Sequence, residues 1–366
     1  MTKPSQGKAG AERRFLAPFN DRSIVPPPVW LMRQAGRYLP EYRDVRAKAG
    51  GFLNLCYDPA LAAEVTLQPI RRYGFDAAIL FSDILVVPDA LGQPLRFAEG
   101  EGPLLDPIRS AAEISRLRPE ATRTKFQRVA ETVQRLRQDL PSETALIGFC
   151  GAPWTVATYM VEGKGSKDQA AARLWAYRDP DGFQALIDLL VTTSIDYLEQ
   201  QVAAGADVLQ IFDTWAGSLP DDELDKWVVT PTRQIVEALK AKHPALPIIG
   251  FPRGIGSSAI WYVAETGVDG IGCDTAMPPY MMSEAFDDER RLHGGGRVVV
   301  QGNLDPLLLV AGGEALEERT NEILDRMAGQ PFIFNLGHGI VPETPPENVA
   351  RLVEIIRGWT PEDDAS

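Results

Sequence analysis

The sequence has little of what several large protein classes require. Only three cysteines and three histidines occur in 366 residues, too few for a disulfide framework and too scattered for a zinc site visible in the sequence. No apolar run approaches the roughly 20 residues of a membrane helix, and residues 1–17 lack the apolar segment of a signal peptide. Net positive charge is also missing, and the formal charge of -13 argues against nucleic acid or an anionic membrane as a partner. We therefore expect a cytoplasmic protein of a reducing compartment.

Short catalytic motifs are missing as well. No Gly-x-Gly-x-x-Gly opens the first strand-helix unit, which removes the main support for dinucleotide binding. No Gly-x-Ser-x-Gly indicates a nucleophile elbow, and neither His-x-x-x-His nor Cys-x-x-Cys nor His-x-Cys indicates a metal site. The sequence therefore predicts neither a cofactor nor a metal.

What the sequence does contain is a regular alternation of strand and helix. Short apolar runs that read as buried strands are Val29–Met32, Ala77–Phe81, Ala145–Phe149, Val208–Phe212, Pro247–Phe251, Val268–Ile271, Val298–Val300 and Phe332–Phe334. Amphipathic stretches of helical length separate most of them. About eight such repeats in a chain of this length favour the α/β class and a single-domain TIM (β/α)8 barrel over an open sheet.

The ends of the chain differ from its body. Residues 1–20 are predicted to be a flexible N-terminal segment, and residues 361–366 an acidic tail. Residues 21–360 contain no low-complexity linker, so they are predicted to form the barrel as one domain.

Polar residues and glycines follow nearly every predicted strand. In a barrel these positions face a shared crevice, so converging polar strand ends indicate an active site. The segments are Arg33–Arg37, Ser82–Asp83, Cys150–Trp154, Asp213–Trp215, Pro252–Gly254, Cys273–Asp274, Gln301–Asn303 and Asn335–Gly339.

Arg33 and Arg37 follow an apolar run directly, where guanidinium groups can form paired hydrogen bonds with carboxylate or phosphate. They are suited to a substrate with several negative charges. Gly36 between them would let the backbone approach a ligand closely. The alternative is a structural salt bridge from either arginine to Glu41 or Asp44.

Four further strand-end side chains have both a functional and a structural interpretation. Asp83 is either a carboxylate directed into the barrel mouth or the cap of a turn. His338, between two glycines, either approaches a ligand or is a hydrogen-bonded structural histidine. The hydroxyl groups of Tyr159 and Thr214 lie near two more strand ends, although most such groups only satisfy backbone atoms.

Two long segments carry a family resemblance. Pro28–Arg43, with Met-Arg-Gln-Ala-Gly-Arg-Tyr at its centre, and Gly148–Gly163, with Cys-Gly-Ala-Pro-Trp-Thr, resemble the two signatures of the uroporphyrinogen decarboxylase family. Shorter matches follow in order at Leu80–Leu85, Ile211–Trp215, Gln301–Pro306 and Asn335–Ile340, so the resemblance spans about residues 22–356.

The resemblance implies a fold, a reaction and a set of partners. It implies a cofactor-independent TIM barrel that works as a homodimer with the two clefts facing each other. The implied reaction removes the acetate carboxylates of uroporphyrinogen III as CO2, leaves methyl groups and gives coproporphyrinogen III, in haem and chlorophyll biosynthesis.

The same resemblance assigns residues. Carried over position by position, the implied substrate-binding residues are Arg33, Gln34, Ala35, Gly36, Arg37, Phe52, Asp83, Tyr159, Thr214 and His338. Thr214 replaces a serine found in some members and keeps its hydroxyl. Pro252-Arg253-Gly254 departs from the lysine-glycine pattern expected there, so Arg253 receives no role.

The catalytic candidates are Asp83, Arg37 and Arg33. Without a cofactor, the electron pair released with CO2 must enter the pyrrole ring after the ring is protonated on carbon, and a carboxylate from Asp83 would stabilise that cation. At least one arginine is expected to clamp a carboxylate that does not react, and Arg37 is the candidate for proton delivery, directly or through water. Two other functions compete: a zinc-dependent methyltransferase of the same barrel superfamily, and a tetrapyrrole carrier without catalysis.

Overall fold

The computed structural model describes residues 13–98 and 102–361. Two of the predicted segments lie partly outside the described residues: positions 1–12 of the N-terminal segment and positions 362–366 of the acidic tail.

Seven parallel strands form one curved sheet in the order β1, β4, β5, β6, β7, β8, β9. Their bounds are Ala77–Ile79 (β1), Ala145–Gly151 (β4), Val208–Asp213 (β5), Ile248–Pro252 (β6), Gly270–Gly272 (β7), Val299–Leu304 (β8) and Phe332–Leu336 (β9). They coincide with all the predicted strands except the first, which confirms that part of the prediction.

The first predicted strand closes the barrel with one bridge instead of a full ladder. Val29 pairs in parallel with Phe334 of β9, and the Phe334 N–H donates to the Pro28 carbonyl at 2.9 Å. On the other side, the Asp76 N–H donates to the Val29 carbonyl at 3.0 Å, next to β1. Three prolines precede Val29 and have no N–H to donate, so the ladder cannot extend backwards. This segment completes a single-domain TIM barrel.

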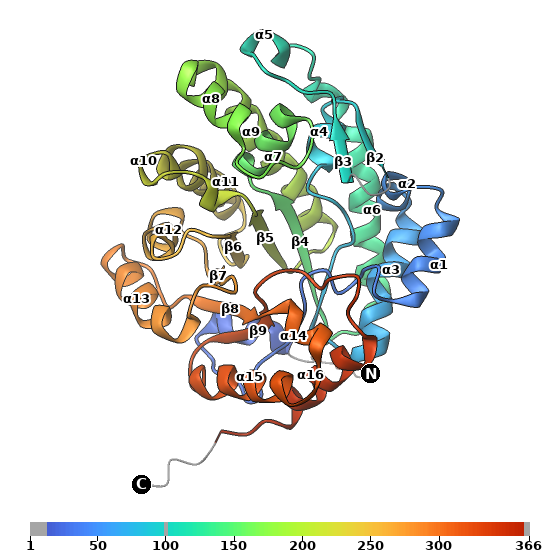
Figure 1. Cartoon of the computed structure of the whole chain (residues 1–366), viewed down its shortest axis with the longest axis vertical. Helices are drawn as coiled ribbons and strands as arrows, with labels where there is room; N and C mark the ends of the chain where they lie inside the picture. Colours follow the sequence, from blue (N-terminus) through green and yellow to red (C-terminus); the bar gives the residue numbers. More distant parts are fainter. Residues whose placement is uncertain (1–12, 99–101, 362–366) are drawn as a thin grey trace, which may run out of the picture.

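Helices surround the central strands, as Figure 1 shows. Their bounds are Pro40–Lys48 (α1), Phe52–Tyr57 (α2), Pro59–Tyr73 (α3), Val86–Ala90 (α4), Ala111–Ile114 (α5), Arg123–Asp139 (α6), Pro153–Glu162 (α7), Ala170–Arg178 (α8), Pro180–Ala204 (α9), Asp221–Leu224 (α10), Thr230–Lys242 (α11), Ser258–Thr266 (α12), Pro279–Leu292 (α13), Pro306–Ala311 (α14), Gly313–Arg326 (α15) and Pro346–Gly358 (α16). Within residues 13–98 and 102–361, no helix has the length and apolar character needed to cross a bilayer.

Local sequence determines where these helices begin and end. In α3, the Asp58 carboxylate accepts from the Ala60 and Leu61 N–H groups, both at 3.0 Å, and proline follows it at the first helical position. Gly74 ends the same helix with a φ of 65°, in the left-handed region that glycine adopts without steric strain.

A short helix closes the floor of the barrel. Residues Arg14–Asn20 form a 3-10 helix, η1, although the sequence assigned them to a flexible segment. Phe15 of η1 is fully buried against inward-facing residues at the amino ends of the strands, among them Ala145, Val208 and Val299. The burial of this aromatic ring explains why the predicted flexibility does not extend to residues 14–20.

A two-stranded antiparallel hairpin lies outside the barrel sheet. It consists of β2 (Leu95–Ala98) and β3 (Gly102–Leu105), inserted between α4 and α5. Phe97 of β2 packs on the ring of Phe52, with the centroids 4.6 Å apart. The hairpin therefore covers the element that carries Phe52.

We expect Phe15→Ala to lower the free energy of unfolding by about 3–5 kcal/mol, because it leaves a cavity in the packed floor of the barrel. Urea denaturation followed by circular dichroism measures the change. Leu292→Ala, at a side chain that is 81% exposed, is the matched control and should stay within about 0.5 kcal/mol of wild type. Equal stability of the two variants would contradict the packing of η1.

Candidate active site

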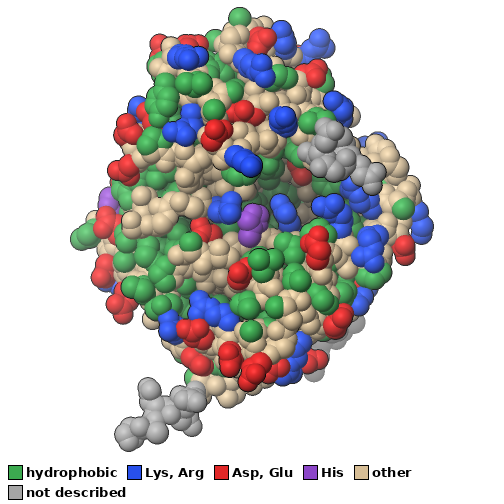
Figure 2. All heavy atoms as spheres, viewed as in Figure 1, with side chains coloured by type: hydrophobic (Ala, Val, Ile, Leu, Met, Phe, Trp, Pro, Cys, Tyr) green, Lys and Arg blue, Asp and Glu red, His purple; other side chains and the backbone are tan. Residues whose placement is uncertain are grey.

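The carboxyl ends of the parallel strands meet at one mouth, and the predicted site residues follow these ends. Arg33 follows the closing segment, Asp83 follows β1, Thr214 follows β5 and His338 follows β9. Figure 2 shows a hollow at the centre of one face, with Lys and Arg side chains gathered around its rim together with a histidine.

Arg33 is the residue that connects this cluster. Burial is the main influence on the pKa of both Asp83 and His338, and it raises the first and lowers the second. The positive charge of Arg33 acts downward on both pKa values, which places the guanidinium near both groups. Its side chain also lies against Gly339: a Cβ added there would be 2.6 Å from Cγ and 2.9 Å from Nε of Arg33. Only glycine leaves room for the arginine at this point. Arg33 itself has a φ of 62°, which is uncommon for a residue with a side chain.

Hydrogen bonds hold the Arg33–Arg37 loop. The Gln34 side chain is fully buried, accepts from the Leu31 N–H at 3.1 Å and donates to the Ala77 carbonyl at 3.1 Å. Gln34 therefore positions the loop with its side chain. The Ile340 N–H donates to the Met32 carbonyl at 2.9 Å, which ties the loop to the segment after β9. Ala35 and Gly36 are half-buried between the two arginines.

The two arginines have no carboxylate partner in residues 13–98 and 102–361. Glu41, one of the alternatives predicted from spacing, pairs with Arg72 at 3.1 Å instead. Neither Arg33 nor Arg37 makes a side-chain hydrogen bond or ion pair with a described residue, and both are exposed. Both guanidinium groups are therefore available to an anion from solution.

Asp83 both caps a turn and presents a carboxyl oxygen at the mouth, the two roles that the sequence left open. Its Oδ1 accepts from the Leu85 N–H at 2.8 Å, which holds the turn into α4. No described residue donates a hydrogen bond to Oδ2. Burial raises the pKa of Asp83, while the Leu85 N–H and the charge of Arg33 act in the opposite direction. One oxygen thus fixes the carboxyl group and leaves the other for a ligand.

His338 has a defined tautomer. The Gly339 N–H donates to Nδ1 of His338 at 2.6 Å, so the neutral ring carries its proton on Nε2. Burial lowers the pKa of His338 to about 4, and the positive charges of Arg33 and Arg253 act in the same direction. At neutral pH this side chain is a hydrogen-bond donor without charge.

A buried acid, Asp213, links the elements that carry Tyr159 and Thr214. Thr155 of α7 donates its hydroxyl hydrogen to Asp213 Oδ1 at 2.5 Å and accepts from the Trp215 N–H at 3.0 Å. This network links α7, which carries Tyr159, to the loop with Thr214. The rings of Tyr159 and Trp215 lie 6.4 Å apart. Burial raises the pKa of Tyr159, and of Asp213 to about 7.

Phe52 contributes an apolar ring that is half-buried at the start of α2. The guanidinium of Arg46 lies 4.9 Å from its centroid, and Phe81, two residues before Asp83, makes an edge contact at 5.9 Å. Phe52 is therefore connected to the β1 end of the mouth.

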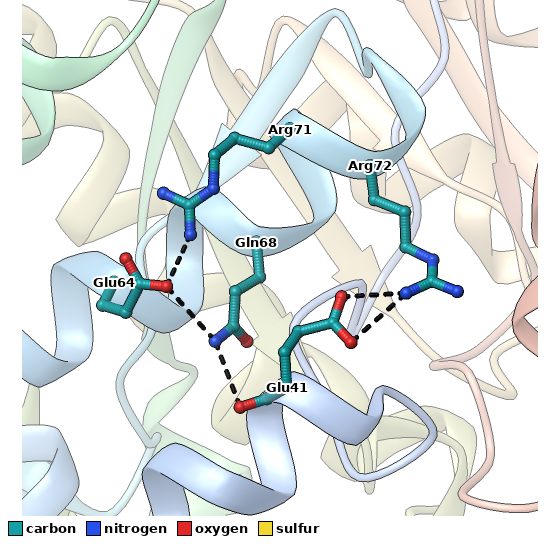
Figure 3. A pocket seen from close by; sticks show the side chains of 5 residues that line it. All are labelled: Glu41, Glu64, Gln68, Arg71 and Arg72. Atoms are coloured by element: carbon teal, nitrogen blue, oxygen red, sulfur yellow. Dashed lines mark hydrogen bonds and ion pairs between the residues drawn. The ribbon is translucent and has the colours of Figure 1, made fainter.

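A recess on the outer surface has a different character. It is lined by Glu41, Glu64, Gln68, Arg71 and Arg72, from α1 and α3. Figure 3 shows that its charges are paired with each other: Arg71 with Glu64 at 2.5 Å and Arg72 with Glu41. These pairs neutralise the recess, which makes it a poor site for an anion.

The cysteines have no part in the mouth. Cys56, Cys150 and Cys273 are buried, and burial raises the pKa of each thiol. Where the structure describes the chain, no group of three or more His, Cys, Asp and Glu side chains is arranged to hold a metal.

Two features of the mouth were missed or left without a role by the sequence. Arg253, after β6, is half-buried and has no hydrogen-bond or ion-pair partner for its guanidinium among the described residues. The contact of Thr155 with Asp213 joins positions 58 residues apart, so no local pattern could indicate it.

The fold and this cluster define the class of protein: a TIM barrel whose mouth presents the half-buried carboxyl group of Asp83 among unpaired cations and neutral hydrogen-bond donors. The model of the family "Uroporphyrinogen decarboxylase (URO-D)" matches residues 11–359. The chain belongs to the uroporphyrinogen decarboxylase family, which is a family of carboxy-lyases. The resemblance inferred from the two signatures is thereby confirmed.

Individual relatives agree with this assignment. A uroporphyrinogen decarboxylase of Rhodospirillum rubrum is 53% identical over 357 residues, 98% of this chain and 99% of the relative. One of Chelativorans sp. is 56% identical over 347 residues, 95% of this chain and 98% of the relative. Among solved structures, a methyltransferase from Methanosarcina mazei has a TM-score of 0.71 at 20% identity, over 94% of this chain and 97% of that one. This similarity supports the barrel fold alone.

We expect His338 to remain neutral, with the proton on Nε2, as the pH is lowered from 7 to 5, because its pKa is about 4. Imidazole nitrogen shifts in 15N NMR measure both properties, and the spectrum of His338→Asn assigns the signal. A ring that is protonated at pH 6, or one with its proton on Nδ1, would contradict this geometry.

Asp213 should make the fold less stable as the pH rises from about 4 to 7. Its pKa is raised to about 7 in the folded chain, so the folded state holds a proton that the unfolded state has already lost. The expected slope is about 1 kcal/mol per pH unit. Asp213→Asn removes this slope in urea titrations at several pH values, whereas Asp188→Asn, on the exposed face of α9, retains it. An unchanged slope in Asp213→Asn would show that the pKa is not raised.

Proposed function

We propose that this chain decarboxylates uroporphyrinogen: it removes the acetate carboxylates of uroporphyrinogen III as CO2, leaves methyl groups and yields coproporphyrinogen III, in tetrapyrrole biosynthesis. Family membership and identities of 53–56% over nearly the whole chain support the reaction. The observation that carries the proposal is the half-satisfied Asp83 carboxyl group beside the unpaired Arg33. We propose the cytoplasm as the location.

The reaction exchanges a carboxylate for a proton. A proton added to a pyrrole carbon makes the ring cationic, and the bond to the departing carboxylate then gives its electron pair to the ring as CO2 leaves. A proton on the remaining methylene carbon and loss of the first proton restore the pyrrole as a methyl derivative. The ring itself accepts the electrons, so the protein must stabilise a cation.

Asp83 is suited to stabilise that cation. Its free oxygen can accept from the pyrrole N–H groups while the Leu85 N–H holds the other oxygen in place. Burial strengthens the interaction between carboxylate and cation compared with water. Binding of the cationic ring also offsets the effect of burial on the pKa of Asp83 and favours its ionised form.

The carboxylate rim of the substrate is bound by the other residues. Arg33 and the Nε2–H of His338 offer donors on one side, and Tyr159 and Thr214 offer hydroxyl groups on another. A cation paired with the departing carboxylate would stabilise the ground state, so Arg33 is assigned to a carboxylate that stays. Arg37 is assigned to proton delivery, directly or through water, and Phe52 packs against the macrocycle.

A homodimer with facing clefts is part of the same proposal. Several large apolar side chains are exposed on helices outside the barrel sheet. These are Leu174 and Tyr177 on α8, Met281 near the start of α13 and Leu307 near the start of α14. The family resemblance supports the dimer, and these side chains are available for its interface.

The test is to incubate the wild-type chain with uroporphyrinogen under anaerobic conditions and to measure coproporphyrinogen and CO2. We expect Asp83→Asn to reduce turnover by a factor of about 10² or more, with substrate binding reduced less than tenfold. Asp188→Asn should match wild type. Binding without CO2 release in wild type would support the tetrapyrrole carrier, and near-normal turnover of Asp83→Asn would remove Asp83 from the mechanism.

A further inference from the structure

Arg253 lies across the barrel from Arg33 and Arg37. The strands follow one another around the mouth as the Val29 segment, β1, β4, β5, β6, β7, β8 and β9. Arg253 follows β6 directly, and β6 is halfway around this ring from the Val29 segment. The mouth therefore has a cation on the wall that faces the arginine pair.

The backbone of Arg253 is fixed on both sides. Its N–H donates to the Asp213 carbonyl at 3.0 Å, and its carbonyl accepts from the Gly217 N–H at 3.0 Å. The next N–H, of Gly254, donates to Asp274 Oδ2 at 2.6 Å. The side chain thus starts from a rigid point, which lowers the entropy lost when it binds a ligand.

The guanidinium itself is unpaired among the described residues. Neither carboxyl group at the ends of the neighbouring strands forms an ion pair with it. Asp213 is buried, with Oδ1 accepting from Thr155, and both oxygens of Asp274 accept backbone N–H groups at 2.6 and 2.8 Å. The side chain is half-buried, and its charge reaches His338, whose pKa it helps to lower. A cation that is partly removed from water and faces other cations is stabilised by an incoming anion.

We infer that Arg253 binds a carboxylate of the substrate that does not react, on the edge of the macrocycle opposite to Arg33 and Arg37. This inference rests on the proposed function. Carboxylates occur all around a uroporphyrinogen ring, so two opposed cationic walls clamp it from both sides. Arginine offers two parallel N–H donors to a carboxylate, where a lysine would offer one point charge.

The inference separates Arg253 from the catalytic step. Because the bound carboxylate is a propionate that remains in the product, Arg253 must bind coproporphyrinogen as well as uroporphyrinogen. We expect Arg253→Gln to raise KM about 10 to 100-fold and to weaken coproporphyrinogen binding by a similar factor, with kcat within about threefold of wild type. For Arg253→Lys, we expect KM and the Kd of coproporphyrinogen to lie between the values of wild type and Arg253→Gln.

The experiment measures kcat and KM with uroporphyrinogen, and the Kd of coproporphyrinogen by anaerobic calorimetry, for wild type and both variants. Arg291→Gln, at an exposed position of α13, is the control and should leave all three constants unchanged. Unchanged circular dichroism and Tm show that Arg253→Gln is folded. If Arg253→Gln is not folded, the same three constants of Arg253→Lys test the inference.

Each outcome decides between the two proposals. Unchanged Kd for coproporphyrinogen in Arg253→Gln, or a loss of kcat with KM unchanged, overturns the role of Arg253. Wild type that binds coproporphyrinogen through Arg253 but releases no CO2 overturns the proposed function and leaves the binding role intact.

Discussion

Closure of the barrel by the Val29 segment is the constraint on which the site depends. The hydrogen bonds of Pro28 and Val29 reach β9 on one side and the residue before β1 on the other. The chain then turns at Arg33, so this one residue is adjacent to the strand ends that carry Asp83 and His338. Without this closure, the two strand ends would be the open edges of a sheet, and no single arginine could act on both.

The mouth has an excess of positive charge because its arginines lack carboxylate partners in the part of the chain that the structure describes, whereas acids and bases on the outer surface pair with each other. The protein carries a formal charge of -13, yet Arg33, Arg37 and Arg253 have no carboxylate partners among the described residues. Elsewhere acids and bases pair, as in the outer recess between α1 and α3. Unpaired cations in a partly buried mouth bind an anion more strongly than the same cations on an open surface would.

The architecture could be predicted from the sequence because each barrel strand is a short run of consecutive apolar residues. Runs such as Ala145–Phe149 are buried on both faces, and burial is visible in composition. The N-terminal helix η1 was mispredicted because its stabilisation comes from Phe15 contacting strands more than a hundred residues away. The β2–β3 hairpin was not predicted either, since its pairing lies outside the repeat of strand and helix.

The residues of the site could be predicted in part, because a residue that directly follows a barrel strand lies at the mouth of the barrel. Asp83, Thr214 and His338 follow strands, and all three lie at the mouth. What could not be predicted is which side chains are already satisfied. Gln34 looks like a ligand-binding residue in the sequence, but both ends of its amide are used inside the protein. No role for Arg253 followed from the sequence, and only the three-dimensional structure shows that no described residue pairs with its guanidinium.

A single fixed carboxyl group has a consequence for the order of events. In the proposed mechanism, the Leu85 N–H holds Asp83 in one place, so each pyrrole that reacts is brought to the same point of the mouth in turn. The macrocycle must therefore rotate or leave and return between steps. Cations on opposite walls support such re-entry, because the propionates persist through every step and are distributed around the ring. Under the proposed roles, the walls thus bind intermediates that differ only in the number of acetates already lost, while the chemistry remains at Asp83.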